Sequence, residues 1–177
     1  ADSKISGHVD ANALTSVTYW TMVFGNNSDA PQEAQAKIAL PPNAAISRVT
    51  LWVNGKPQEA AFNSTWRVEQ AYQWITERHR DPLLITETAN GVVNLQAFPV
   101  PKFGEMKIRI GITSGLDAKS KRDFSFVAPR IISSNFGLDD AKTFVKLESN
   151  APKSSNAEDG NSVSRSGKLI YTGQILP

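Results

Sequence analysis

Acidic, basic and imidazole side chains that could perform acid–base chemistry lie together in one short segment of this 177-residue chain, Glu77-Arg78-His79-Arg80-Asp81. A histidine between carboxylates is suited to moving protons, and arginines are suited to holding an anion. The same charges are also typical of a helix C-terminus, where cations complement the macrodipole. We favour this helix-terminus interpretation over an acid–base site. As a charged corner at the end of the helix, Arg78, His79, Arg80 and Asp81 are a candidate surface for contact with a protein partner. A hydrolase with an unrecognised site stays open as an alternative.

Residue types for metal, nucleophilic and phosphate chemistry are scarce. The chain has no cysteine, which excludes disulfides, thiolate nucleophiles and zinc–thiolate sites. Its two histidines are His79 and His8, which lies in a polar N-terminal lead-in, and they form no HExxH pair. There is no G-x-S-x-G elbow and no glycine-rich phosphate loop. We predict no catalytic residue, no metal and no cofactor, and therefore a protein that is not an enzyme.

Four tryptophans offer another kind of chemistry, because an exposed aromatic ring can stack on a sugar or a peptide. Trp20 and Trp52 lie in strand-like segments. Trp66 and Trp74 are eight positions apart in a helix-like segment, so they lie near one another and near its apolar stripe. Packing of that helix on a sheet is the interpretation we favour. We add Trp66 and Trp74 to the candidate interaction surface, and a carbohydrate-binding module that uses exposed tryptophans stays open.

Strand patterns dominate the elements that must position these residues. Residues 106–113 alternate, with isoleucines at 108, 110 and 112 on one face and Lys107 and Arg109 on the other. Asn54-Gly55 and Asn90-Gly91 each predict a tight hairpin turn. The predicted strands are residues 17–24, 33–40, 46–53, 58–62, 83–88, 92–98, 106–113, 124–127, 143–147 and 169–176.

One segment has the period of a helix instead. Between Trp66 and Arg78, apolar residues recur at Val68, Ala71, Tyr72 and Ile75, which is a helical stripe. Asp81-Pro82 ends the segment, because the residue before a proline avoids the helical conformation. The predicted fold class is mainly β: an antiparallel β-sandwich-like domain with one amphipathic α-helix packed on it.

Charge and hydropathy limit the partners. Nineteen lysines and arginines against seventeen acids give a net charge of +2, which is too small to indicate a nucleic-acid partner. No run approaches the roughly 20 apolar residues that a membrane-spanning helix needs. We therefore expect no nucleic acid as ligand and no direct membrane insertion by this segment.

The order of the elements resembles the VIT domain, the vault and inter-alpha-trypsin module, over about residues 17–113. Two short motifs carry the first part of the resemblance: the Leu-Pro step LPPNAA at 40–45 and the hairpin VNGK at 53–56. The helix with its following leucine pair (EQAYQWITERHRDPLLI) and the closing stretch (VVNLQAFPVPKFGEMKIRIGIT) carry the rest. The versions Arg80-Asp81-Pro82 and Phe98-Pro99-Val100 resemble bacterial, envelope-associated members of the family.

The resemblance implies a non-catalytic module that sits before an adhesion-type domain in a larger protein. We therefore expect a protein-interaction or structural module of an exported or membrane-anchored bacterial protein. Its partner would be another protein or an adjoining adhesion-type domain of the same chain. An Ala-Asp start is typical of signal cleavage, so we expect a cell-envelope location, periplasmic or extracellular.

The domain organisation follows from the same comparison. We predict a single domain over residues 1–177, with a VIT-like core at 14–114 and a β-rich C-terminal extension at 115–177. Within the extension, residues 149–167 are rich in Ser, Asn and Gly, and this composition predicts a mobile loop.

Overall fold

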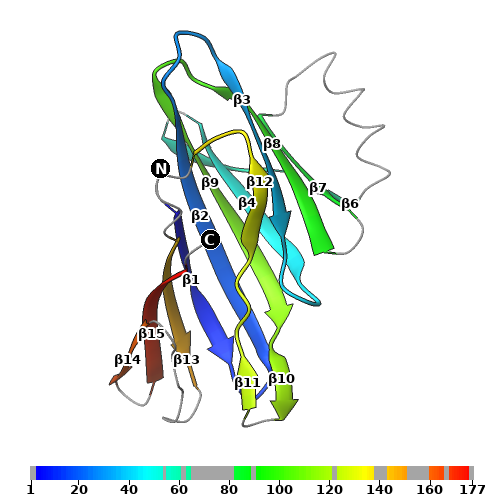
Figure 1. The fold of residues 1–177 in the computed structure, drawn as a ribbon, viewed down its shortest axis with the longest axis vertical. Helices are drawn as coiled ribbons and strands as arrows, with labels where there is room; N and C mark the ends of the chain where they lie inside the picture. Colours follow the sequence, from blue (N-terminus) through cyan, green and yellow to red (C-terminus); the bar gives the residue numbers. More distant parts are fainter. Residues whose placement is uncertain are drawn as a thin grey trace.

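Fifteen β-strands make up the part of the chain that the computed structural model describes (Figure 1). The described residues are 3–53, 55–60, 63–64, 82–88, 91–120, 123–137, 143–150, 160–165 and 168–175. The strands are β1 Ser3–Asp10, β2 Thr15–Asn26, β3 Gln32–Ala39, β4 Ala45–Val53, β5 Lys56–Glu59, β6 Asn63–Ser64, β7 Leu83–Glu87, β8 Val92–Val100, β9 Gly104–Gly115, β10 Asp117–Ser120, β11 Asp123–Ser125, β12 Arg130–Ser134, β13 Thr143–Ser149, β14 Gly160–Arg165 and β15 Lys168–Ile175. The prediction of a mainly β fold is confirmed.

The larger sheet has eight strands in the order β14-β15-β13-β1-β2-β9-β4-β5. β2 and β9 pair along their whole lengths, from Thr15 opposite Gly115 to Asn26 opposite Gly104. Neighbouring strands are antiparallel except β1 and β13, which run parallel. Strands from the two ends of the chain therefore lie side by side in one sheet.

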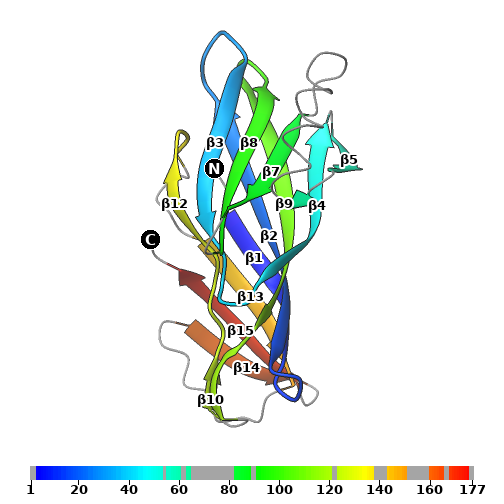
Figure 2. The ribbon, with the colours of Figure 1, turned by 90° about the vertical axis from the view of Figure 1, so that its right-hand side faces the viewer.

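The second sheet has five strands in the order β12-β3-β8-β7-β6. Only β6 and β7 run parallel among its described strands. Figure 2 shows β3, β8 and β7 lying in front of β1, β2 and β9, so the two sheets form two layers. β10 and β11 form a separate hairpin at the end of the molecule where β14 lies (Figures 1 and 2). The predicted antiparallel sandwich is correct apart from the two parallel pairs.

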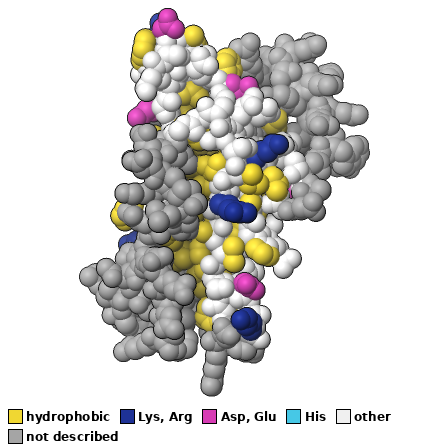
Figure 3. Space-filling view, viewed as in Figure 1, with side chains coloured by type: hydrophobic (Ala, Val, Ile, Leu, Met, Phe, Trp, Pro, Cys, Tyr) yellow, Lys and Arg dark blue, Asp and Glu magenta, His cyan; other side chains and the backbone are white. Residues whose placement is uncertain are grey.

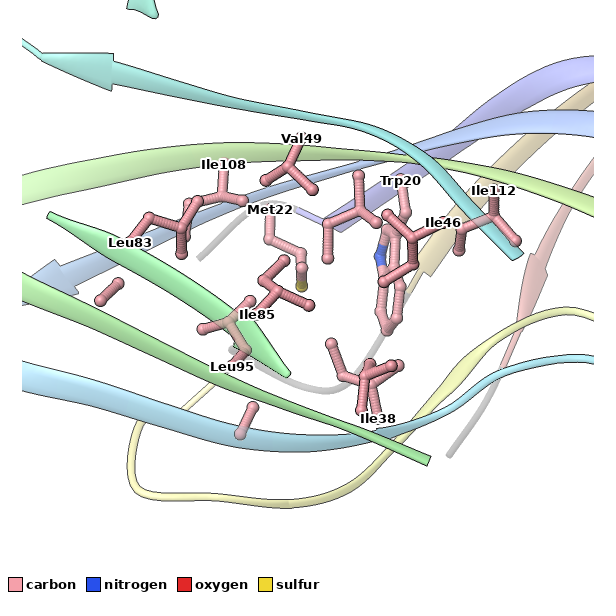
Figure 4. Close-up of a cluster of buried hydrophobic side chains, with 14 of the residues drawn as sticks. Trp20, Met22, Ile38, Ile46, Val49, Leu83, Ile85, Leu95, Ile108 and Ile112 are labelled. Carbon is pink, nitrogen blue, oxygen red and sulfur yellow. The ribbon is translucent and has the colours of Figure 1, made fainter. Parts of the chain in front are cut away.

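Apolar side chains from alternate strand positions fill the space between the sheets. In β9, Ile108, Ile110 and Ile112 are each at most 1% exposed. Figure 4 shows Ile108 and Ile112 on one side of this cluster and Ile38 and Leu95 on the other. Burying a side chain of this size contributes about 1.5 to 3 kcal/mol. The inward face of β9 therefore holds the two layers together.

Both predicted hairpin turns are confirmed. β4 and β5 pair antiparallel with Val53 opposite Lys56. β7 and β8 pair antiparallel up to Glu87 opposite Val93, and Thr88 N donates to Val92 O at the turn. Gly55 has a φ of 75° and Gly91 a φ of 69°. Glycine adopts these left-handed conformations without the steric cost that a Cβ atom brings, which explains its position in both turns.

β1 corrects the prediction of a polar lead-in before residue 14. This strand lies between β13 and β2 in the larger sheet. Its inward positions are Ser3, Ile5, Gly7 and Val9. Two of these four residues are small or polar, so the sequence lacks the apolar alternation that usually reveals a strand.

Two further predictions, a helix at residues 66–78 and a loop at residues 149–167, fall wholly or partly outside the described residues. The predicted helix over residues 66–78 lies outside the described residues. The predicted loop at 149–167 is wrong in two places, because Ser149 ends β13 and residues 160–165 form β14, which pairs with β15. Backbone groups make these pairs whatever the side chains are, which is why a Ser- and Gly-rich composition hides the strand. None of the described residues belongs to a helix long and apolar enough to cross a membrane.

Candidate interaction surface

The residues that the sequence proposes as a surface are not among those the structure describes. Trp66, Trp74, Arg78, His79, Arg80 and Asp81 all lie outside the described residues. The other histidine, His8, is exposed on β1. Within the described ranges, no three His, Asp or Glu side chains gather in a way that could hold a metal ion. The charged corner therefore stays a prediction.

Of the four tryptophans, the structure describes Trp20 and Trp52. Trp20 points inward from β2 and is 2% exposed, and its Nε1 donates a hydrogen bond to Ser3 Oγ at 2.8 Å. Figure 4 shows the Trp20 ring beside Ile46 and Ile112 in the core. Trp52 is only partly buried and lies on the outer face of β4. The two rings therefore face opposite sides of the larger sheet.

Three adjacent strands bring aromatic and cationic side chains together on the outer face of the larger sheet. Outward positions of β2, β9 and β4 fall side by side, with Tyr19 opposite Gly111 and Lys107 opposite Trp52. Arg109 lies one outward position along β9 from Lys107. We call Tyr19, Trp52, Lys107 and Arg109 the cation–ring patch.

Both cations of the cation–ring patch lie over aromatic rings. Lys107 Nζ is 4.4 Å from the centre of the Trp52 ring. Arg109 Cζ is 5.3 Å from the centre of the Trp52 ring and 5.6 Å from the centre of the Tyr19 ring. Such contacts stabilise a cation by about 0.5 to 1 kcal/mol at exposed sites. They hold the two cations in place without neutralising their charge.

Gly111 makes room for the Tyr19 ring. A Cβ atom at this position would lie 3.3 Å from Tyr19 Cε1, 3.0 Å from Ser47 Oγ and 3.2 Å from Arg48 Cβ. These distances are shorter than ordinary contacts. Glycine therefore lets the ring lie against the backbone of β9, next to Arg109.

An ion pair borders the cation–ring patch on the β5 side. Arg48 Nε donates to Glu59 Oε2 at 2.7 Å, and Thr50 Oγ1 donates to Glu59 Oε1 at 3.1 Å. The hydrogen bond from Arg48 is the main cause that lowers the pKa of Glu59, and the same bond raises the pKa of Arg48. The charge of Arg109 adds to the lowering of the Glu59 pKa. Among the described residues, however, no carboxylate forms an ion pair with Lys107 or Arg109.

A second ordered region lies where the β2–β3 connection meets the β8–β9 turn. Asn26 Nδ2 donates to Ala30 O at 2.7 Å and to Val100 O at 3.2 Å, and Ser28 N donates to Asn26 Oδ1 at 2.9 Å. Phe103 N donates to Ser28 O at 3.1 Å. The buried Asn26 amide therefore joins the two connections, and Phe103 is 71% exposed beside them.

A third polar cluster joins the end of β1 to the residue after β13. Asn150 Nδ2 donates to Asp10 Oδ1 at 3.0 Å, and Ala11 N donates to Asn150 Oδ1 at 2.7 Å. The backbone amides of Ala13 and Asn12 also donate to the Asp10 carboxylate. The bond from Asn150 is the largest cause, and the amides the next, of a lowered pKa for Asp10. This cluster is structural, because each polar group in it already has a partner.

On the face that Figure 3 presents, described charged side chains are scattered singly among hydrophobic and neutral polar atoms. That view gives no block of one charge within the described part of the chain. The cation–ring patch is therefore the candidate site with the clearest chemical character.

Sequence reasoning places Lys107 and Arg109 on the outer face of their strand correctly, and it misses the cation–ring patch. The patch depends on which strands are neighbours, and β2, β9 and β4 are far apart in the sequence. The signal available in the sequence was an outward arginine and lysine on one strand together with aromatic residues at outward positions of two others.

These observations define a two-sheet β-sandwich with a cationic and aromatic outer face. Within that class, the chain belongs to the VIT domain family. The model of this family, the vault protein inter-alpha-trypsin domain, matches residues 3–112, which is more than half of the chain. The match confirms the resemblance seen in the sequence and extends it through β1.

Three known proteins show further similarity. A von Willebrand factor A domain-containing protein of Dictyostelium discoideum is 23% identical over 113 residues, which are 64% of this chain and 12% of that protein. The M1 zinc metallopeptidase of Deinococcus radiodurans is 11% identical at a TM-score of 0.47, over 98% of this chain and 38% of that chain. ACE19, the collagen binding subdomain of the Enterococcus faecalis surface protein ACE, is 7% identical at a TM-score of 0.41, over 77% of this chain and 93% of that chain. The chain thus spans only a small part of the curated relative.

Proposed function

We propose that this chain is a non-catalytic protein-interaction module of a larger protein, and that it recognises its partner with the outer face of the eight-stranded sheet. The observation that carries the proposal is the cation–ring patch. Two cations are held over rings at 4.4 to 5.6 Å, without a carboxylate partner among the described residues. Aromatic and arginine side chains are enriched where proteins bind one another.

The family supports this role. VIT domains are generally non-catalytic modules, and the curated relative is a longer protein named for a von Willebrand factor A domain. The partner we propose is therefore an adjoining adhesion-type domain of the same polypeptide or a separate protein. The residues of the cation–ring patch suit either partner, because recognition of a protein surface needs no reacting group.

The organisation and location that the sequence predicts belong to the same proposal. We propose one domain over residues 1–177, supported by pairing of β1 with β13 and of β3 with β12. A cell-envelope location is supported by the resemblance of Arg80-Asp81-Pro82 to envelope-associated members.

The predicted corner at Arg78, His79, Arg80 and Asp81, with Trp66 and Trp74, is a second contact region in this proposal. Its support is the charge of the segment. An Arg78→Ala, Arg80→Ala double variant that binds the partner as the parent protein does would remove the corner from the proposal.

A site-specific photo-crosslinker in the full-length protein tests the main surface. Thr21 is directly opposite Arg109 on the outer face, and Lys37 is an exposed position on the other sheet. We expect benzoylphenylalanine at position 21 to crosslink to a protein or to an adjoining domain, and the yield to fall when Arg109→Gln is added. Position 37 is the control. Equal crosslinking from positions 21 and 37, or a yield that Arg109→Gln leaves unchanged, contradicts the proposal.

A further inference from the structure

Arg109 lacks the partners that a partly buried arginine normally has. Its Nε atom is buried and makes no hydrogen bond, which is costly for a polar group. Its terminal nitrogens are not buried and have no hydrogen-bond partner among the described residues. Rings that lie against a guanidinium leave the donors in its plane free. The rings therefore hold the side chain in place, and its terminal donors are free to bind a ligand.

The fork of donors on a guanidinium matches the two oxygens of a carboxylate. Lys107 adds a second positive charge on the same face of β9. Two acids flank the patch on this face: Glu59, which is hydrogen-bonded to Arg48 and Thr50, and Glu105, which is exposed two residues before Lys107 on β9. Neither forms an ion pair with Lys107 or Arg109. The cation–ring patch therefore has an excess of positive charge that an acidic ligand would complement.

The spacing of the two cations limits the shape of that ligand. Lys107 and Arg109 are two residues apart on one strand, so their Cα atoms are about 7 Å apart. Acidic residues at every second position of an extended peptide repeat at the same distance. Val17 and Tyr19, 42% and 37% exposed on the neighbouring strand, add apolar surface beside the cations, against which the stems of the acidic side chains can pack.

We infer that the cation–ring patch binds an extended acidic peptide segment, with Arg109 and Lys107 pairing to carboxylates at alternate positions of that segment. This inference deepens the proposed function and rests on it. A sugar ligand is disfavoured because two cations already lie over the ring of Trp52, the described tryptophan of the outer face. A peptide ligand uses those cations directly.

A titration of the purified chain with a fluorescent peptide of alternating Glu and Val, eight residues long and blocked at both ends, tests the inference. We expect binding that weakens as salt is added, and little binding of the same peptide with Gln in place of Glu. Arg109→Gln and Lys107→Gln should each weaken binding roughly tenfold, because each removes a charge-assisted hydrogen bond. Arg109→Lys should also weaken it, since lysine keeps the charge and loses the fork.

Lys37→Gln is the matched control, because it removes an exposed cation from the other sheet. It should change the affinity by less than about twofold. Circular dichroism and thermal unfolding of each variant establish that the variants are folded. An equal loss of affinity with Lys37→Gln, or tight binding of dextran sulfate without binding of the peptide, overturns the inference.

The two proposals fail in different ways. If the Glu peptide does not bind while position 21 still crosslinks in an Arg109-dependent manner, the acidic peptide is wrong and the interaction surface stands. If position 21 gives no specific crosslink and the peptide does not bind, the surface itself is wrong.

Discussion

The two faces of the eight-stranded sheet use the same strands for different purposes. On the inner face, Ile108 and Ile110 of β9 are at most 1% exposed and pack between the two sheets. On the outer face, Lys107 and Arg109 of the same strand lie over aromatic rings. The inner face stabilises the fold by excluding water, whereas the outer face keeps charge ordered and accessible. The core and the proposed recognition surface are therefore a single residue step apart along β9.

The largest expected loss of stability comes from a substitution on the inner face of β9, compared with one at the next residue on the outer face. Ile108→Ala should lower the free energy of unfolding by about 2 to 5 kcal/mol, because it leaves a cavity between the sheets. Arg109→Gln should change it by about 1 kcal/mol or less, because the lost contacts with the two rings are partly offset by removal of a buried Nε that has no partner. Urea denaturation followed by tryptophan fluorescence measures both. Similar losses for the two variants would contradict the assignment of the faces.

Two glycines give a second comparison of the faces. A Cβ atom on Gly7 would overlap the backbone oxygen of Val17, whereas the nearest atom to a Cβ on Gly25 is 3.8 Å away. Gly7→Ala should therefore destabilise the protein by about 1 to 3 kcal/mol, because β1 and β2 would have to separate. Gly25→Ala, its control on an exposed outward position, should be neutral or slightly stabilising. Thermal unfolding of the two variants gives the answer, and equal melting temperatures would count against the close approach of β1 to β2.

The two described tryptophans sharpen the comparison further. Trp20→Phe removes the hydrogen bond to Ser3 in the core and should cost about 1 kcal/mol of stability or somewhat more. Trp52→Phe keeps a ring beneath the cations, so its effect on stability should be smaller and its effect on binding of the Glu peptide larger. Chemical denaturation and the peptide titration are measured on both variants. If Trp20→Phe weakened the binding more than Trp52→Phe, the outer face would not be the binding face.

The smallest expected effect is the loss of stability in acid. The pKa values of Asp10 and Glu59 are lowered by hydrogen bonds from Asn150 and Arg48 respectively. A carboxyl group whose pKa is lower in the folded state stabilises the fold above its unfolded pKa, near 4. That contribution falls as the pH drops below 4 through the folded pKa. Melting temperatures from pH 6 to pH 2 should therefore fall less steeply for Asp10→Asn than for the parent chain, and an identical pH dependence would contradict this role of Asp10.

The prediction of the fold from sequence succeeds where one side of a strand is apolar. Residues 106–113 alternate strictly, so the inward isoleucines and the outward Lys107 and Arg109 follow from the pattern. β1 and β14 escape prediction because Ser and Gly occupy positions that usually carry apolar residues. Their pairing comes from the backbone, and composition carries no signal of it.

The candidate surface could be predicted only in part. The alternation of apolar and polar residues predicts which face of the sheet a side chain lies on. It does not predict which strands are neighbours in that sheet. Tyr19, Trp52 and Arg109 meet because β9 lies between β2 and β4, an order set by long-range contacts. The charged corner at residues 78–81 can be identified from the sequence, unlike the cation–ring patch, because its charges are adjacent along the chain.

Amide chemical-shift mapping during titration with the Glu peptide tests the central claim most directly. Recognition by the outer face predicts that the largest shift changes fall on β2, β9 and β4 around Tyr19, Arg109 and Trp52, and that Arg109→Gln removes them. Shift changes centred on residues 78–81, or on the outer face of the five-stranded sheet around Lys37, would contradict the account.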